Sequence, residues 1–511
     1  MSDIKEVIED SFSRYAGNVI LNRAICDARD MLKPSARMLM YSQMAITKNI
    51  PSKPFVKSAR VVGDALGHYY EHGDSSCYGT YMRMAKPFAM RYCLENCQGN
   101  SGTINSTNDE ASMRYTELRL SDLGFSLFND INKETINEWS TNFDETESYP
   151  KVAPSKGYYN ICNGTVGLGI ALSSSIPQFN LKEINNSLIK LLWNPEISFE
   201  EICVLPDYAT GALLLNEDEV RESLRVGCGA AVKLRSVVEY DKKRRTLIVK
   251  ELPYGVYTET INKQIQTLLE KNPNCGIDNV NDASHKTPDY EIYLTKNAKP
   301  DKVLKLLFKE TSLQSYNTIN MTVLVDGKKP AVLGLKELLQ SHLDHEKIVY
   351  TRGFEFDLRK IMARLHIIEG LMKAYDMIDE VVKTIKSSPS SKEANIALRE
   401  LLSIDEIQAK AILDLKLSRL SKLDINKLKD EKSGLEKEKA RIEAILNDEV
   451  LLKKEIEKGL REVAEKFGDA RRTKIMNISN DDEEEDVEEK QLSLSFTNEG
   501  AVFTTETSTL Y

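Results

Sequence analysis

An arginine followed directly by a tyrosine lies at Arg114 and Tyr115, just ahead of an alternating run that predicts a β-strand. A tyrosine hydroxyl can attack a phosphodiester and hold the broken end as a phosphotyrosine. It is a weak nucleophile at neutral pH, because the reference pKa of tyrosine is near ~10. A neighbouring guanidinium favours the phenolate and neutralises charge on the transition state. The pair is a candidate for nucleic-acid cleavage, although most of the 21 tyrosines must be packing or surface groups.

The segments before this pair predict the elements that would position it. Residues 98–115 are rich in Gly, Asn and Ser, so we expect a loop, and loops on a rigid scaffold often carry catalytic groups. Residues 1–30 predict a helix, and residues 30–34 end it before a second helix that begins around Ser35.

A second pair of helices is predicted between residues 57 and 85. The apolar stripe of residues 61–69 predicts the first, and Gly73 would end it. Asp74 or Ser75 would cap the next one. Two helices joined by a short glycine turn in basic surroundings resemble a helix-turn-helix, although that pattern alone is weak support for DNA binding.

Composition and cysteine usage exclude several classes of protein. A chain of 511 residues predicts three or four domains, and its 41% hydrophobic content is that of a soluble globular protein. No apolar run approaches the ~20 residues of a membrane span, and the acidic start has no signal-peptide pattern. The eight cysteines form no CxxC pair, which indicates free thiols in a reducing cytosol rather than a zinc site.

Charge is distributed unevenly along the chain. The net charge is -9, but residues 23–91 hold eleven Lys or Arg against five Asp or Glu. Every residue of the segment 481–489 except Val487 is acidic. A local basic face of this kind is what contact with phosphates requires, so the overall acidity does not exclude a nucleic-acid partner.

With these stretches in view, the chain resembles the A subunit of bacterial-type type IIA DNA topoisomerases, gyrase and topoisomerase IV. The matching stretches occur in the family's order from about residue 1 to 475. So many matching motifs in the same order are very specific for this family. They are residues 30–34, 57–64, 72–75, 83–85, 98–100, 113–120, 163–168, 176–177, 251–254, 408–415 and 467–473.

The resemblance assigns roles to individual residues. It implies that Tyr115 is the nucleophile and Arg114 its electrostatic partner. The residues that it implies as contacts of DNA or of the scissile phosphate are Arg23, Lys33, Arg37, Arg60, His72 and Ser75. For each of these the alternative is a solvated or salt-bridged side chain. No metal ligand is expected in this chain, because the family's metal-binding carboxylates lie on a separate B subunit.

Two departures from the family pattern lower the local positive charge. The family's His-Pro-His is Tyr70-Glu71-His72 here, so one histidine is missing and an acid has entered. The family's second arginine after Arg37 is Met38. We expect the chemistry to survive, because Tyr115, Arg114, Lys33 and Arg37 remain, and we expect only the fine tuning of the rate to be affected.

The resemblance also implies an α+β multidomain fold. Residues 1–150 would form a winged-helix breakage-reunion domain, and residues 151–340 an α/β tower domain. Strand-like runs near 231–235, 246–250 and 290–294 alternate with helical runs in that second region. Leu168 occupies the place of the family's intercalating wedge, which unstacks a base step and bends the duplex; an ordinary core leucine is the alternative.

Residues 341–475 predict a long antiparallel coiled coil. Apolar residues recur every three or four positions from residue 353 to 385 and again from 428 to 467. The segment between them, about residues 393–421, predicts a helical cap with more apolar residues than it can bury alone. A homodimer through this cap, the family's exit gate, is the expected result.

Residues 476–511 predict an acidic linker and two strands, with a turn at residues 498–500. They resemble the start of the family's DNA-wrapping β-pinwheel. Two strands cannot hold a separate fold, so the wrapping domain is expected to be truncated, absent or on another polypeptide.

The expected function is that of the DNA-cleaving and rejoining subunit of an ATP-dependent topoisomerase. Its expected partners are double-stranded DNA and a B subunit in an A2B2 complex, with Mg²⁺ and ATP bound by that B subunit, and no membrane. The expected location is the cytoplasm, in association with DNA. The departures at Cys26, Tyr70, Glu71 and Met38 suggest a divergent lineage, such as a viral one that acts in a bacterial host. Two alternatives stay open: a non-catalytic architectural DNA-binding protein with winged-helix and coiled-coil parts, and a catalytically inactive paralogue.

Overall fold

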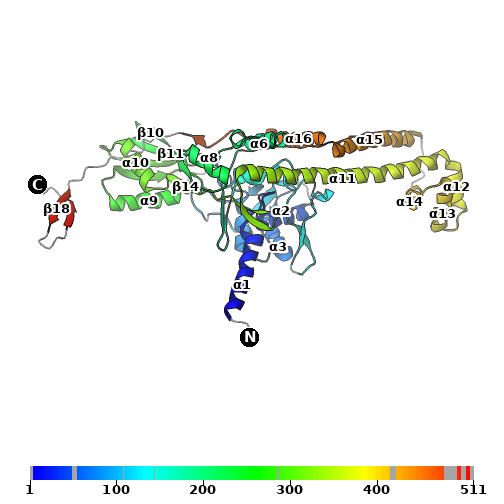
Figure 1. Ribbon diagram of the computed structural model, residues 1–511, viewed down its shortest axis with the longest axis horizontal. Coiled ribbons are helices and arrows are strands. Elements are labelled where there is room, and N and C mark those ends of the chain that lie inside the picture. Colours follow the sequence, from blue (N-terminus) through cyan, green and yellow to red (C-terminus); the bar gives the residue numbers. More distant parts are fainter. Residues whose placement is uncertain are drawn as a thin grey trace.

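The computed structural model shows an elongated molecule of mixed helix and sheet, with one very long helix running away from a central body (Figure 1). It describes residues 4–48, 54–107, 109–142, 144–284, 287–414, 422–476, 492–496 and 502–506. The acidic segment 481–489, the turn at 498–500 and the end of the predicted cap lie outside these residues. No helix among the described residues is long and apolar enough to cross a membrane.

The N-terminal part of the body packs short helices against a small antiparallel sheet, whose strand order is β1-β3-β2. Its elements are helix α1 (Ile4–Val19), the π-helical turn η1 (Ile20–Ala24), α2 (Pro34–Thr47), β1 (Val56–Lys57), α3 (Ser58–His68), α4 (Asp74–Arg83), β2 (Glu95–Gln98), β3 (Glu117–Leu120) and α5 (Asp122–Ser126). The predicted strand after Tyr115 is confirmed as β3, and the segment 99–115 is a loop, as predicted.

Three helix boundaries differ from the predictions. The first helical run ends at residue 24 rather than 30, because Asp27 and Asp30 accept backbone N–H groups and Met31 has a φ of 55°. Helix α3 ends at His68 rather than at Gly73. Gly73 is the N-cap of α4 and no side chain caps that helix, so Asp74 and Ser75 lie in its first turn.

Hairpins and short turns join this part to the larger sheets. They are the 3-10 turn η2 (Ile131–Lys133), β4 (Trp139–Thr141) with β5 (Ser148–Pro150), the 3-10 turn η3 (Asn160–Asn163), and β6 (Thr165–Leu168) with β7 (Ser173–Ile176). One hydrophobic core runs from Leu39 and Met40 through Tyr159 and Phe179 to Leu234. The predicted division at residue 150 therefore does not coincide with a break in the core.

The predicted strands and helices of the second region are present. Its helices are α6 (Leu181–Trp193), α7 (Phe199–Ile202), α8 (Glu217–Val226), α9 (Thr258–Lys271) and α10 (Pro300–Glu310). Its strands are β8 (Leu213–Leu214), β9 (Val232–Arg235), β10 (Val237–Asp241), β11 (Thr246–Glu251), β12 (Ile277–Asp282), β13 (Tyr290–Leu294), β14 (Gln314–Asn317), β15 (Thr322–Val325) and β16 (Lys329–Val332). A four-stranded sheet, β10-β11-β13-β12, shares a second core with α9 and α10.

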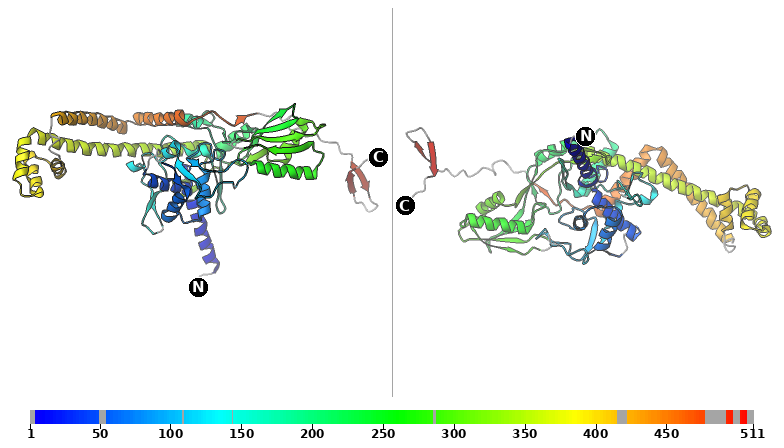
Figure 2. Two further views of the ribbon diagram at one scale, coloured as in Figure 1. Left: turned by 180° about the vertical axis from the view of Figure 1, so that it is seen from behind. Right: turned by 90° about the horizontal axis from the view of Figure 1, so that it is seen from below.

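A helical arm extends from the body, and two of its long helices lie side by side (Figures 1 and 2). The arm consists of α11 (Leu335–Asp376), α12 (Ile378–Ser387), α13 (Ser391–Leu402), α14 (Glu406–Leu413), α15 (Lys422–Asn447) and α16 (Glu449–Phe467). The first long helix begins at Leu335, earlier than the predicted residue 353, because its first turns are buried on several faces and lack a single apolar stripe. Asp448 separates α15 from α16 and its side chain accepts a hydrogen bond from the N–H of Val450.

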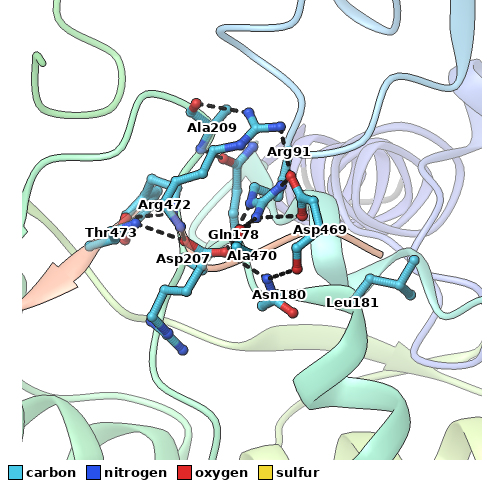
Figure 3. Close-up of polar contacts among 12 residues, drawn as sticks. Arg91, Gln178, Asn180, Leu181, Asp207, Ala209, Asp469, Ala470, Arg472 and Thr473 are labelled. Atoms are coloured by element: carbon cyan, nitrogen blue, oxygen red, sulfur yellow. Dashed lines mark hydrogen bonds and ion pairs between the residues drawn. The ribbon is translucent and has the colours of Figure 1, made fainter. Parts of the chain in front are cut away.

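After α16 the chain returns to the body, where β17 (Lys474–Ile475) pairs in parallel with β8. Arg91, whose side chain is fully buried, donates to Asp207 Oδ2 at 2.7 Å and to Asp469 Oδ2 at 2.8 Å (Figure 3). Asp207 Oδ1 also accepts from the backbone N–H groups of Arg472 and Thr473. We call these five residues the Arg91 junction; it fastens the returning chain to the body. The described strands β18 (Leu492–Phe496) and β19 (Val502–Glu506) form the predicted hairpin.

Candidate nucleic-acid cleavage site

Tyr115 stands out from the surface of the body, with 70% of the residue exposed. It ends a tight turn in which its own N–H donates to the carbonyl of Ser112 at 2.8 Å. Arg114 is also exposed, and its guanidinium carbon lies 5.5 Å from the centre of the Tyr115 ring. The hydroxyl is therefore accessible to a large substrate, and a permanent positive charge lies beside it.

The turn is exposed, but the backbone on both sides of it is fixed. The N–H of Ala59 donates to the carbonyl of Met113 at 3.1 Å, and the N–H of Ser58 donates to that of Thr116 at 3.0 Å. Both donors belong to the start of α3. The loop is thus attached to a rigid helix on the side that faces the body.

A glycine allows a second segment to approach the turn closely. Gly99 has a φ of 107°, and a Cβ atom there would lie 3.0 Å from the carbonyl oxygen of Tyr115. The next residue, Asn100, accepts from the N–H of Ala111 at 3.1 Å and donates from its side chain to the carbonyl of Asp109 at 2.6 Å. Gly99 therefore lies against the backbone of Tyr115, and Asn100 holds the part of the loop that precedes the turn.

Several of the predicted phosphate contacts are basic side chains that lie exposed on the N-terminal part of the body. Arg23 is exposed at the end of η1, Arg60 is exposed on α3, and His72 is exposed with its ring edge-on to Tyr70 at 4.9 Å between centroids. Lys33 is half-buried at the start of α2, and its Nζ donates to the carbonyl of Val166 at 2.5 Å. Burial lowers the pKa of Lys33.

Arg37 does not have the geometry of a DNA contact, which corrects the expectation for this residue. It is 5% exposed, and its Nε and Nη2 donate to the two carboxylate oxygens of Asp30 at 2.7 and 2.9 Å. Nη2 also donates to the carbonyl of Leu32 at 2.9 Å. The side chain holds the turn between η1 and α2, so it positions Lys33 and does not face solvent.

Ser75 is exposed in the first turn of α4, where its N–H and hydroxyl both donate to Asp74 Oδ1, at 2.8 and 3.4 Å. No hydrogen bond or ion pair among the described residues joins Tyr115 to Arg23, Lys33, His72 or Ser75. The structure therefore brings Tyr115 and Arg114 together as one pair. It places the other predicted contact residues on the same body without a hydrogen bond or ion pair to that pair.

A sequence model that describes the A subunits of DNA gyrase and topoisomerase IV matches residues 23–461. This chain belongs to that family. It is 37% identical to the DNA gyrase A protein of Fibrobacter succinogenes over 98% of this chain and 56% of the relative. It is 36% identical to that of Clostridium acetobutylicum, over 98% of this chain and 61% of the relative. It is 38% identical to that of Metamycoplasma arthritidis, over 94% of this chain and 54% of the relative.

The chain spans between half and two thirds of the length of these gyrase A relatives. The matched residues include the Tyr115 loop, the cations around it and most of the helical arm. The family assignment therefore covers both the candidate site and the elements that position it.

In this gyrase A relative, Leu168 lies at the tip of the β6–β7 hairpin and is 82% exposed. A core leucine, the alternative considered from the sequence, would be buried, so that alternative is excluded. Gly167 is next to it, and a Cβ atom there would lie 2.2 Å from the carbonyl of Ala24. The hairpin therefore packs closely on η1 and carries Leu168 outward.

Three residues at the site had no role predicted from the sequence. Ser58, Tyr78 and Thr116 lie around the turn and share hydrogen bonds, although they are up to 58 positions apart. A hydroxyl-bearing side chain has no distinctive spacing in a sequence, so their meeting becomes visible only in three dimensions. Among the described residues, no group of three or more His, Cys, Asp or Glu side chains could hold a metal ion.

Proposed function

We propose that this chain is the DNA-cleaving and rejoining subunit of an ATP-dependent type II DNA topoisomerase. The observation that carries the proposal is the exposed Tyr115, beside Arg114, on a loop whose flanks are fixed to α3. A fixed loop supplies orientation, which is a large part of catalytic rate, while the exposed hydroxyl stays open to a duplex. The family membership of the chain supports the same function.

The proposed reaction is a transesterification at a DNA phosphate. The hydroxyl oxygen of Tyr115 attacks phosphorus and loses its proton, and the bond from phosphorus to the 3′ oxygen of the neighbouring nucleotide breaks. The 3′ oxygen leaves with a proton, and the 5′ phosphate stays on the tyrosine. Arg114 stabilises the added negative charge. The reverse reaction reseals the strand without further energy, because one phosphodiester replaces another.

A bound Mg²⁺ would polarise the phosphate oxygens in such a reaction. We propose that a B subunit supplies this ion together with the ATPase, in an A2B2 complex. In this proposal the chain binds and orients DNA, and its eight free cysteines fit a reducing cytoplasm.

The same proposal includes the finer architecture. The N-terminal helices and small sheet form a winged-helix DNA gate, α11 with α15 and α16 forms a coiled coil, and α13 with α14 belongs to a dimeric exit gate. Exposed Ile396 and Ile407 on those two helices support an apolar contact with a second copy. Two copies would present two Tyr115 residues to one duplex, cut both strands, and let a second duplex pass.

The experiment that tests the function is a cleavage assay. The chain is mixed with a gyrase B subunit, Mg²⁺ and supercoiled plasmid, the reaction is stopped with detergent, and protein attached to 5′ ends is measured. We expect adduct with the natural chain and none with Tyr115→Phe, which removes the attacking oxygen.

Tyr316→Phe is the matched control for that assay, because Tyr316 is an exposed tyrosine on β14. It should form adduct like the natural chain. Adduct with Tyr115→Phe would refute the nucleophile assignment. A natural chain that binds DNA without adduct would instead favour an architectural or inactive protein.

A further inference from the structure

Tyr78 bridges the two sides of the turn that carries Tyr115. Its hydroxyl, from α4, lies 2.5 Å from the carbonyl oxygen of Ala111 and 2.9 Å from the Thr116 hydroxyl oxygen. Ala111 precedes the turn and Thr116 follows it. One side chain therefore contacts the backbone before Arg114 and the side chain just after Tyr115.

The protons in this group can be assigned from chemistry. A carbonyl only accepts, so Tyr78 must donate its single hydroxyl proton to Ala111. Thr116 then donates to Tyr78, and the Ser58 hydroxyl donates toward Thr116, where its single proton is shared between Oγ1 at 2.8 Å and the carbonyl oxygen at 3.2 Å. Ser58 and Thr116 are fully buried and Tyr78 is half-buried. The result is a directional chain of three hydroxyl groups that ends on the Ala111 carbonyl.

Burial also raises the pKa of Tyr78, which keeps its hydroxyl protonated and able to donate. No other side chain of the described residues forms hydrogen bonds on both sides of the turn. The Asn100 side chain forms a hydrogen bond only with the segment before the turn. The backbone N–H groups of Ala59 and Ser58 donate to the turn itself and to the residue that follows it.

We infer that Tyr78 is a positioning residue for the cleavage reaction: its hydroxyl sets the direction in which Tyr115 is presented to the scissile phosphate. The inference rests on the proposed role of Tyr115. Tyr78 does not touch the reacting atoms. It acts by closing the base of the turn, so that the hydroxyl of Tyr115 is held at one position and Arg114 stays beside it.

The test uses Tyr78→Phe, which removes one oxygen and keeps the ring. With the chain and a gyrase B subunit bound to plasmid DNA, Mg²⁺ is added and adduct formation is followed in a single turnover. We expect the cleavage rate to fall by about 10- to 100-fold, the range that a misplacement near 1 Å can cause. The affinity for DNA should not change, because the exposed cations are untouched.

Tyr81→Phe is the control, since Tyr81 lies on the same helix and donates to Gln43 Oε1 at 2.5 Å, away from the turn. It should cleave like the natural chain, even if it lowers the thermal midpoint as much as Tyr78→Phe does. A purely structural role for Tyr78 would instead make the two variants behave alike.

Thr116 provides the second measurement. Thr116→Ser keeps the hydroxyl and should retain cleavage, whereas Thr116→Val removes it and should resemble Tyr78→Phe. The double variant Thr116→Val with Tyr78→Phe should cleave DNA no more slowly than either single variant, because both substitutions break the same series of hydrogen-bonded hydroxyl groups. Tyr78→Phe with the natural cleavage rate overturns the inference but leaves the proposed function intact. A natural chain without adduct overturns the proposed function itself.

Discussion

Lys33 and Arg37 lie four positions apart, yet the structure gives them different environments. The amine of Lys33 lies at the base of the hairpin that carries Leu168. The guanidinium of Arg37 is enclosed with the carboxylate of Asp30, whose side chain is fully buried. Removing one partner of such a pair leaves an unpaired buried charge and costs about 3–5 kcal/mol of the free energy of unfolding.

We therefore predict opposite effects for the two residues. Arg37→Ala should lower the free energy of unfolding in urea by about 3–5 kcal/mol. In the fraction that folds, the slope of log affinity for DNA against log salt should be unchanged. Lys33→Ala should leave stability nearly unchanged and reduce that slope by about one, as expected when one phosphate contact is lost.

A reduced salt slope for a folded Arg37→Ala chain would show that Arg37 reaches a phosphate after all. A natural slope for Lys33→Ala would remove Lys33 from the phosphate contacts. The sequence could not separate the two residues. The pairing of Arg37 with Asp30, seven positions earlier, depends on the left-handed backbone at Met31.

At the scale of elements, the β6–β7 hairpin places an apolar side chain where solvent, rather than protein, surrounds it. Val166 and Leu168 both point outward, and Gly167 between them packs on Ala24. An exposed apolar tip is costly to keep unless it contacts something in the functional state. Insertion between stacked bases is the contact that the proposed function supplies.

Leu168→Ala should therefore change the free energy of unfolding by less than about 0.5 kcal/mol, because no core contact is lost. It should reduce the bend of a short bound duplex, measured by energy transfer between dyes on its two ends. Val226→Ala, at an exposed apolar position at the end of α8, is the control and should keep the bend. An unchanged bend with Leu168→Ala would exclude the wedge role.

Most elements could be predicted from the sequence, and the exceptions have physical causes. The alternating runs near 246–250 and 290–294 pair as predicted strands, with Leu247 opposite Ile292. The start of α11 was missed because that part of the helix is enclosed by the body and has buried polar residues such as His342 and Glu346. The periodicity of apolar residues identifies a helix with one apolar face. It does not identify a helix that other parts of the protein enclose on all sides, because such a helix has no single apolar stripe.

At the scale of the whole molecule, both ends of the helical arm are fixed to one body. At the start of α11, His342 Nδ1 donates to the Arg29 carbonyl at 2.9 Å and the ring stacks on Tyr159. Glu346 Oε1 accepts from the N–H of Gly157 at 2.5 Å. At the other end, the Arg91 junction holds the chain that leaves α16. The arm is therefore attached to the body at two places.

The buried Glu346 makes stability depend on pH. Burial raises its pKa to about 8 from 4.5, so the folded protein keeps a proton that the unfolded chain releases. The stability that protonated Glu346 contributes to the folded state is complete below pH 4.5 and is lost as pH rises toward 8. In that window it lowers the free energy of unfolding by about 1.4 kcal/mol per pH unit.

Glu346→Gln removes this titration and keeps the shape of the side chain. We predict that the natural chain, relative to this variant, loses stability steadily in urea unfolding between pH 5 and 8. His342 Nε2 lies 3.8 Å from Glu346 Oε2, and burial lowers the pKa of His342 to about 3, so we expect its ring to stay neutral in both folded proteins between pH 5 and 8. Parallel stability profiles for the two proteins would show that Glu346 is ionised in the folded state.

The central claim is that Tyr115 carries the cleaved strand, and peptide mapping of the trapped adduct tests it most directly. After detergent trapping and nuclease digestion, trypsin should cut after Arg114 and Arg119 and release a five-residue peptide that begins with Tyr115. We predict a nucleotide mass on the tyrosine of that peptide. Cleaved DNA with the nucleotide on another side chain, or on no side chain of this protein, would contradict the claim.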